Sequence, residues 1–167
     1  MKIHKIRVDE LSRSCEKLKE YIDQEKPNWI IPICSGGLEL CELLWGRDRI
    51  PDNIIHGVYI QHNPGIIKDI VKYLPECVTD LMRKVDCVRP KSKKRKVICG
   101  DLSELTGKIL ILDDAIDTGV TIDILKSRLK GKNIKAAVIN NIQGSQGIDF
   151  SVYNRVLIKF PWNIDYK

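Results

Sequence analysis

The stretch "ILILDDAIDTGVT", from Ile109 to Thr121, joins an apolar run to a cluster of acids and a turn. The run "KILIL", from Lys108 to Leu112, is continuous and rich in branched side chains, as the central strands of parallel sheets are. Two adjacent carboxylates follow it, and Asp-Thr-Gly comes shortly after. Because ligands bind at the carboxyl ends of strands in open α/β sheets, this segment predicts a binding site there.

The flanking sequence alternates between strand-like and helix-like patterns. The run "WIIPI", Trp29 to Ile33, precedes the tight turn "CSGG" and then a segment with helical spacing. Further patterns predict a short strand at Val85 to Val88, an amphipathic helix at Thr121 to Lys132 and a strand at Ile134 to Ile142. This alternation predicts an α/β fold with a mainly parallel, twisted sheet flanked by helices.

The length and composition argue against a membrane protein, a secreted protein and a zinc-binding protein. The 167 residues fit a single domain. No apolar run approaches the ~20 residues that span a bilayer, and the N-terminus lacks the apolar core of a signal peptide. The six cysteines include no C-x-x-C pair, which argues against a structural zinc site and favours reduced thiols. We therefore expect a cytoplasmic protein with no membrane partner.

The net charge of +6 is concentrated in one segment. "RPKSKKRK", from Arg89 to Lys96, holds six basic residues and no acid, so the rest of the chain balances at 6 − 6 = 0. A general nucleic-acid binder usually spreads its charge over a face, so nucleic acid is not the expected partner. The segment is either a solvated loop or a mobile loop that closes over a polyanionic ligand.

The acids and the turn together suit a sugar phosphate. Paired carboxylates can hydrogen-bond a cis-diol or hold Mg²⁺ through water. The amides of the turn, the Thr118 and Thr121 hydroxyls and a flexible Gly119 can cradle a phosphate. The alternative is that Asp117 or Thr118 only caps the following helix. The dinucleotide-binding and P-loop glycine motifs are absent, so the segment does not belong to either of those classes of phosphate site.

The same stretch resembles the phosphoribosyl pyrophosphate (PRPP) signature of the type I phosphoribosyltransferases, and it is closest to the hypoxanthine-guanine and xanthine enzymes. "PICSGGLELCELL" is similar to their pyrophosphate-loop segment, and "VDCVRPKS" with "KVICGDLSELTGK" is similar to their catalytic-loop region. "FPW", Phe160 to Trp162, is similar to the end of their hood. The resemblance covers roughly residues 30–162. It implies one domain over residues 1–167, with a core at about 28–142 and a hood at about 1–10 and 143–167.

The resemblance implies transfer of phosphoribose from PRPP to a purine base, giving a nucleoside monophosphate and pyrophosphate in purine salvage. It implies Mg²⁺ as the cofactor and a homodimer as the assembly. Asp113 and Asp114 would hold the ribose hydroxyls and the Mg²⁺ shell. Asp117 would face the purine N7 as a general base, which indicates a 6-oxopurine. The 5-phosphate would lie on Asp117, Thr118, Gly119, Val120 and Thr121.

The resemblance also assigns the two remaining parts of the site. The pyrophosphate would be bound by Ser35, Gly36, Gly37, Lys91 and Ser92. We expect Lys93 and Arg95, with Lys94, to close over the pyrophosphate and exclude water. The base would be bound by a side-chain amide and an aromatic or apolar surface, for which the candidates are Asn141, Gln143, Leu157, Phe160 and Trp162.

Two other functions remain open from the sequence. One is a non-catalytic relative that senses PRPP or a nucleotide, or that binds nucleic acid through the basic segment. The other is an enzyme that acts on a modified base. Both are motivated by the base-binding region, where the expected lysine is absent from "VINNIQG", Val138 to Gly144.

Overall fold

The computed structural model describes residues 2–55, 58–61, 75–88, 96–99, 101–163 and 166. Within these residues, no helix combines the length and the apolar character needed to cross a bilayer. The elements, in chain order, are β1 (Ile3–Lys5), α1 (Val8–Glu25), β2 (Trp29–Cys34), α2 (Gly36–Trp45), the 3₁₀ helix η1 (Arg47–Arg49), β3 (Val58–Gln61), α4 (Glu76–Val88), β4 (Lys96–Ile98), β5 (Lys108–Ile116), α5 (Val120–Arg128), β6 (Asn133–Asn141), β7 (Phe150–Asn154) and β8 (Leu157–Lys159).

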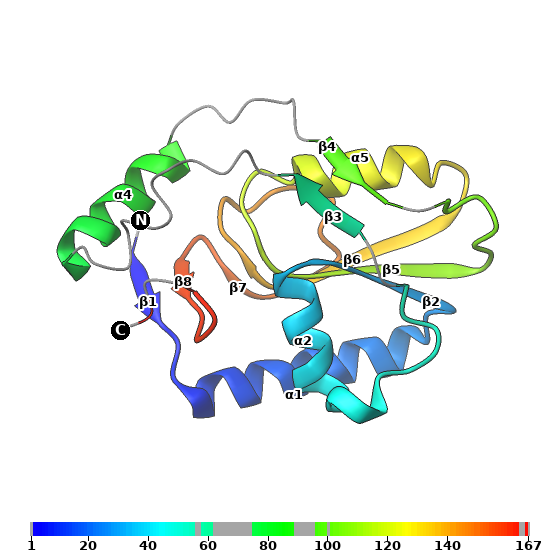
Figure 1. The fold of residues 1–167 in the computed structure, drawn as a ribbon, viewed down its shortest axis with the longest axis horizontal. Coiled ribbons are helices and arrows are strands. Elements are labelled where there is room, and N and C mark those ends of the chain that lie inside the picture. Colours follow the sequence, from blue (N-terminus) through cyan, green and yellow to red (C-terminus); the bar gives the residue numbers. More distant parts are fainter. Residues whose placement is uncertain are drawn as a thin grey trace.

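The main sheet has six strands in the order β4-β3-β2-β5-β6-β7 (Figure 1). Neighbouring strands are parallel except β3 and β4, which are antiparallel. β5 lies between β2 and β6, and its backbone is paired on both edges from Ile109 to Leu112. The predicted mainly parallel α/β sheet is confirmed, and the apolar runs read as strands at 29–33, 108–112 and 134–142 lie in β2, β5 and β6.

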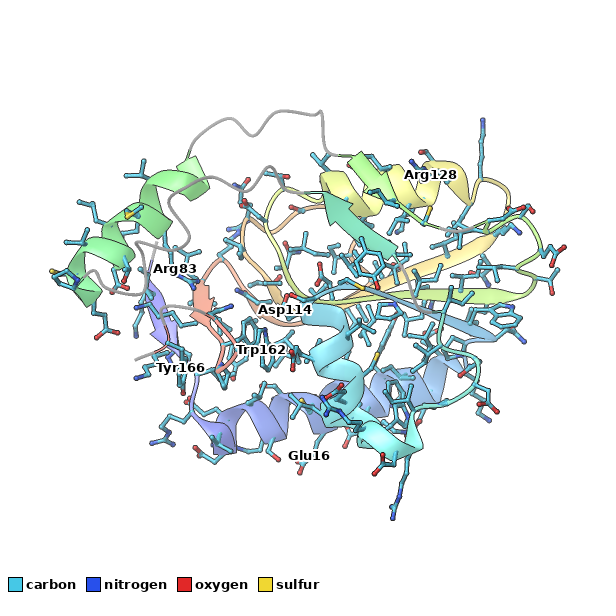
Figure 2. All side chains as sticks on the ribbon, viewed as in Figure 1. Glu16, Arg83, Asp114, Arg128, Trp162 and Tyr166 are labelled. Carbon is cyan, nitrogen blue, oxygen red and sulfur yellow. The ribbon has the colours of Figure 1, made fainter. Side chains whose placement is uncertain are left out.

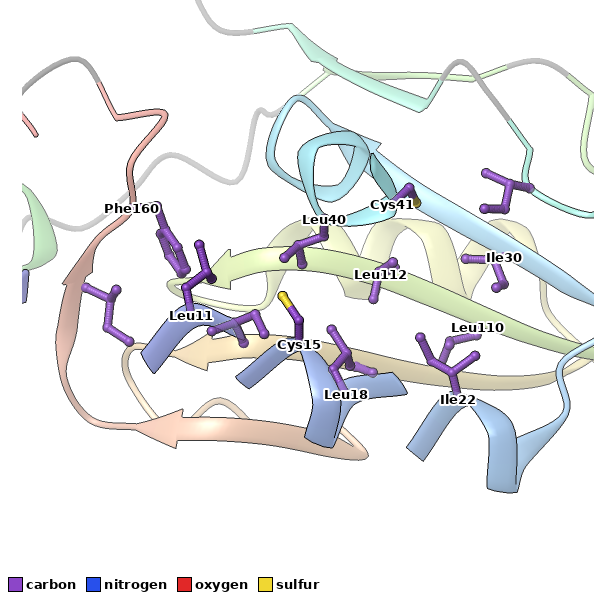
Figure 3. Close-up of a cluster of buried hydrophobic side chains, with 14 of the residues drawn as sticks. Leu11, Cys15, Leu18, Ile22, Ile30, Leu40, Cys41, Leu110, Leu112 and Phe160 are labelled. Carbon is purple, nitrogen blue, oxygen red and sulfur yellow. The ribbon is translucent and has the colours of Figure 1, made fainter. Parts of the chain in front are cut away.

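The two faces of the sheet are covered by different helices. Helices α1 and α2 lie on one face and α5 lies on the other (Figure 1). Leu110 and Leu112 of β5 join a core cluster with α1 and α2 (Figure 3), whereas Ile109 and Ile111 join the cluster that α5 completes. This alternation follows from the two-residue period of a strand. Each such buried side chain contributes roughly 1.5–3 kcal/mol of transfer free energy.

A second, smaller sheet forms where the hood was predicted. β1 and β8 pair in parallel, from Ile3↔Leu157 to Lys5↔Lys159, and within the described part of the chain neither pairs with the main sheet. The Lys159 side chain is 1% exposed, and its ammonium group forms ion pairs with Glu76 at 3.2 Å and Asp80 at 2.5 Å. Both acids belong to α4, so these contacts fix that helix against the small sheet (Figure 1).

One predicted strand is wrong. Val85 to Val88 are the last residues of α4 and not a strand. Val78, Leu81 and Val85 recur at spacings of three and four residues, which is the helical period. A run of four residues is too short to show its period, and the helix becomes visible only over the thirteen residues of α4.

Candidate functional site

The two adjacent acids lie inside β5, beyond the reach of β2. We predicted that the strand ends at Leu112, but it continues to Ile116. The correction has a simple cause, because β6 keeps pairing with β5 as far as Ile116↔Asn141. β2 pairs with β5 only as far as Pro32↔Leu112, and its last two residues, Ile33 and Cys34, pair with β3 before α2 begins at Gly36. Asp113 and Asp114 therefore stand where the pairing of β5 with β2 has ended and its pairing with β6 has not.

The two carboxylates point toward opposite faces of the sheet. Asp113 continues the side of Ile111, toward α5, and Asp114 continues the side of Leu112, toward α2. Asp113 is buried at 8% exposure, and its Oδ1 accepts a hydrogen bond from the Asp114 backbone N–H at 2.9 Å. The two carboxylates thus lie on different sides of β5, and Asp114 is the one beside the turn at the start of α2, where a Cβ atom on Gly36 would meet it.

The Asp114 carboxylate is enclosed between α2 and the hood (Figure 2). Its Oδ2 accepts a hydrogen bond from the Trp162 indole N–H at 2.7 Å, and its Oδ1 accepts one from the Ala115 backbone N–H at 2.7 Å. A Cβ atom on Gly36 would lie 2.2 Å from this carboxylate. Burial raises the pKa of Asp114 above its ordinary value, and the hydrogen bonds from Trp162 and Ala115 partly oppose that rise.

The turn from Asp117 to Thr121 presents donors at the start of α5. Gly119, with φ of 77°, is the N-cap of α5, and Val120 is its first residue. Neither Asp117 nor Thr118 is therefore the N-cap residue, so the helix-capping interpretation is wrong for both. The first amides of a helix have no partner within it, so they can receive an anion. The Thr118 hydroxyl is buried and finds no hydrogen-bond partner among the described residues.

The Ser35 turn lies at the start of α2, next to Asp114. Ser35 is the exposed N-cap of α2, and its hydroxyl makes no capping hydrogen bond. A Cβ atom on Gly37 would lie 2.5 Å from the Leu112 carbonyl oxygen. The two glycines are thus required by close packing against β5, in addition to any role in binding pyrophosphate. Lys91, Ser92, Lys93 and Arg95, which were predicted to bind or close over pyrophosphate, lie outside the described residues.

The predicted base-binding residues have different environments. Leu157 and Phe160 are buried at 3% and 1% exposure, and Phe160 belongs to the core cluster of α1 and α2. Trp162 is half-buried and stacks on Phe160, with ring centroids 4.9 Å apart and an interplanar angle of 11°. Phe160 therefore supports Trp162, and Trp162 is the aromatic side chain of this pair nearer the acids.

The two amide candidates lie at the end of β6 and in the loop that follows it. Asn141 is buried at 5% exposure, and both ends of its amide bond the backbone of Ser145. Gln143 is exposed, and its Nε2 donates a hydrogen bond to Asp117 Oδ1 at 2.8 Å. Sequence reasoning identified both residues but missed these partners, together with Ser145. The turn residues of "NNIQGS" indicate a loop after β6, but they carry no signal for the segment on which the loop packs.

The carboxylates of the site suit a magnesium ion that is bound together with a substrate phosphate. The described residues hold no group of three or more histidine, cysteine or acidic side chains that could by itself bind a metal. Two carboxylates beside a phosphate turn match the way Mg²⁺ is commonly bound, through one or two carboxylates, water and substrate phosphates. The resemblance assigns such an ion to Asp113 and Asp114, and because their carboxylates leave β5 on opposite faces, one ion would reach them both only through water or substrate.

Comparison with known proteins gives the fold. No family model and no curated protein matches this sequence. The structure is similar to a purine phosphoribosyltransferase from Pyrococcus horikoshii, with 19% identity and a TM-score of 0.63, covering 98% of this chain and 95% of that one. It is also similar to a xanthine-guanine-hypoxanthine phosphoribosyltransferase from Helicobacter pylori, with 15% identity, a TM-score of 0.62, and coverage of 98% and 93%.

A third similar structure is a hypothetical protein from Neisseria gonorrhoeae with bound ppGpp. It has 16% identity and a TM-score of 0.57, over 97% of this chain and 89% of that one. These likenesses extend over nearly the whole chain, including the hood. The protein therefore has the type I phosphoribosyltransferase fold, as the resemblance in its sequence predicted.

Proposed function

We propose that this protein is a phosphoribosyltransferase that joins a 6-oxopurine base to the ribose of PRPP and releases pyrophosphate. The observation that carries the proposal is the juxtaposition of Asp113 and Asp114 with the turn from Asp117 to Thr121, here called the phosphate turn. The buried Thr118 hydroxyl of this turn has no partner among the residues that the structure describes. A buried hydroxyl without a partner costs stability, which a bound phosphate would recover. The turn and the acids come from one strand–turn–helix unit, so their spacing is fixed by the backbone.

Each part of the turn unit has one task in this reaction. The amides of Val120 and Thr121 and the hydroxyl of Thr118 hold the 5-phosphate. Asp113 and Asp114 receive hydrogen bonds from the ribose hydroxyls and so fix the sugar relative to the base. Bond cleavage at C1′ produces positive charge on the ribose, which nearby carboxylates stabilise. Magnesium, bound to the diphosphate, would neutralise charge on the leaving pyrophosphate.

Asp117 is proposed to accept the proton from the purine ring as the new bond forms. Two findings support a role beyond local structure. The residue does not cap α5, and its carboxylate is contacted by a side chain from the loop after β6. Trp162 is proposed to line the part of the site that binds the purine base. Its indole N–H donates a hydrogen bond to Asp114, and its ring stacks on Phe160. An aromatic surface there suits a flat base.

An assay of hypoxanthine, guanine and xanthine with PRPP and Mg²⁺ tests the proposal directly. Each base is converted to its monophosphate, and the absorbance change or a radioactive label in the base reports the product. We expect turnover of at least one 6-oxopurine and none of adenine. Absence of turnover with every purine base, while PRPP still raises the melting temperature, would reject the transferase function and keep the binding site.

A second candidate is a protein that binds PRPP or a nucleotide without transferring it. The enclosure of the acids favours this candidate, since Asp113 is 8% exposed and Asp114 is bonded to Trp162. Ribose hydroxyls would have to displace or share these contacts. A thermal-shift panel of PRPP, nucleoside monophosphates and ppGpp separates the two candidates, because a sensor would respond to its nucleotide and leave every base unchanged.

A further inference from the structure

The loop that follows β6 folds back onto the phosphate turn and contacts one residue of it twice. Gln143 Nε2 donates to the Asp117 carboxylate at Oδ1, over 2.8 Å. Ser145 Oγ donates to the Asp117 backbone carbonyl oxygen, over 3.0 Å. A Cβ atom on Gly119 would lie 3.3 Å from the Ser145 side chain. Both the backbone and the side chain of Asp117 are therefore held from the same loop.

This loop is itself fixed by the end of β6. The Asn141 side chain donates to the Ser145 carbonyl oxygen at 3.0 Å and accepts from the Ser145 N–H at 2.8 Å. Gly144, with φ of 68°, supplies the left-handed residue that the tight return requires. The position of Gln143 is thus set by the buried Asn141 on one side and the half-buried Ser145 on the other, although Gln143 itself is exposed. Its contribution to the core is small, so core packing does not explain the contact with Asp117.

We infer that Gln143 is a positioning residue for Asp117, and this inference rests on the proposed function. An amide N–H fixes the direction of a carboxylate through a hydrogen bond but adds no positive charge to it. The hydrogen bond from Gln143 therefore holds one oxygen of Asp117 in place without itself bringing a cation to that carboxylate. A lysine or arginine partner would form an ion pair and compete with the purine for that charge.

The test is a series at position 143 that separates hydrogen bonding from size. Gln143→Leu removes the hydrogen-bond donor and keeps a side chain of similar volume. Gln143→Glu keeps the shape of the side chain but places a second carboxylate against that of Asp117. Gln143→Lys has a different shape but retains an N–H donor. We expect kcat to fall roughly 10- to 100-fold in Gln143→Leu, the size expected for a hydrogen bond to a charged group. The fall should be larger in Gln143→Glu and smaller in Gln143→Lys.

The readout distinguishes positioning from simple support of the loop. The dissociation constant for PRPP, measured by calorimetry with Mg²⁺, should change less than threefold in all three variants, because the phosphate amides are untouched (~0.6 kcal/mol). Gln146→Leu, an exposed amide three residues along the same loop, is the matched control and should leave kcat unchanged. Equal kcat in Gln143→Glu and Gln143→Leu, or parallel loss of kcat and PRPP affinity, would overturn the inference. Lack of turnover in the unmodified protein would instead overturn the proposed function.

Discussion

The indole N–H of Trp162 donates to the Asp114 carboxylate at 2.7 Å, which joins the hood to the acidic strand by one hydrogen bond. Trp162 is in turn held by its stack on Phe160, a core residue at 1% exposure. A shift of the hood would therefore move the partner of an acid that is proposed to bind ribose. The geometry couples the position of the hood to the charge and orientation of that acid.

The pH dependence of stability should reveal the burial of Asp114. Because its pKa is raised in the folded state, the folded protein binds a proton more tightly than the unfolded chain does at this residue. Stability contributed by Asp114 is therefore lost as the pH rises from the ordinary carboxyl range through its raised pKa. Relative to the unmodified protein, Asp114→Asn should become progressively more stable over that same interval.

Unfolding in urea over about pH 3 to pH 8, for both proteins, measures this difference. The absolute stability of Asp114→Asn also depends on its altered hydrogen bonds with Trp162 and Ala115, so the slope with pH is the decisive quantity. The two proteins are compared by the unfolding free energy of Asp114→Asn minus that of the unmodified protein. If this difference stayed constant or decreased with rising pH, a raised pKa for Asp114 would be contradicted.

Gly36→Ala should disturb the site through one atom. The three heavy atoms nearest to a Cβ at this position all belong to the Asp114 carboxylate, at 2.2 to 2.5 Å. Alanine would force the acid out of its contacts with Trp162 and Ala115, so we expect destabilisation of about 1–3 kcal/mol and weaker PRPP binding. Chemical denaturation and calorimetry measure the two effects.

The Asp114→Ala background supplies the control for this substitution. With the carboxylate gone, alanine at position 36 meets no such clash, and its better helix propensity should make Gly36→Ala neutral or stabilising by about 0.5–1 kcal/mol. The sign of the effect therefore depends on Asp114. An equal loss in both backgrounds would show that another neighbour, not the carboxylate, requires glycine.

The strand–turn–helix unit of the site can be predicted from the sequence because the signals for it lie in neighbouring residues. The apolar run of β5, the acids and the glycine of the turn lie within thirteen residues, and each follows from backbone preference or burial. The end of β5 was misplaced because its last residues pair with β6, which is a contact between distant parts of the chain. The local sequence of a strand does not show how far a distant neighbouring strand will pair with it.

The side-chain partners within the site were not predictable for the same reason. Trp162 and Asp114 are 48 residues apart, and Gln143 and Asp117 are 26 apart. The resemblance implied that an aromatic and an amide side chain would bind the base, but the amide of Gln143 contacts the Asp117 carboxylate. The helix α4 was missed where only its last four residues were considered, since their apolar pattern fits either type of element.

Asp117→Asn should separate catalysis from binding. Asparagine keeps the shape of the side chain and an oxygen that can accept from Gln143, so the loop and the phosphate turn should stay in place. It cannot accept the proton of the purine ring, and we expect kcat to fall by about 10² to 10⁴. Steady-state kinetics with the best 6-oxopurine, together with calorimetry of PRPP, measure the two quantities. Equal losses of rate and PRPP affinity would assign Asp117 to phosphate binding alone.

Thr118→Val should raise stability and lower ligand affinity at the same time. The Thr118 hydroxyl is buried without a partner in the described part of the chain, so replacing it by a methyl group of the same size removes an unsatisfied polar atom. We expect the free energy of unfolding to stay equal or rise by up to about 1–2 kcal/mol. The dissociation constant for PRPP should rise about tenfold, which is the loss of one hydrogen bond to a charged group.

Thr79→Val is the matched substitution away from the site. Thr79 is 2% exposed, and its hydroxyl donates to the Glu76 carbonyl oxygen at 2.9 Å within α4. Its valine variant loses a satisfied hydrogen bond, so it should be less stable by about 1 kcal/mol and keep its affinity for PRPP. The same change from threonine to valine should therefore have opposite effects at the two positions: lower PRPP affinity without lost stability at 118, and lower stability without lost affinity at 79. If Thr118→Val lost stability and kept affinity as Thr79→Val should, its hydroxyl would serve the fold, and the phosphate would have to be held by the amides of the turn alone.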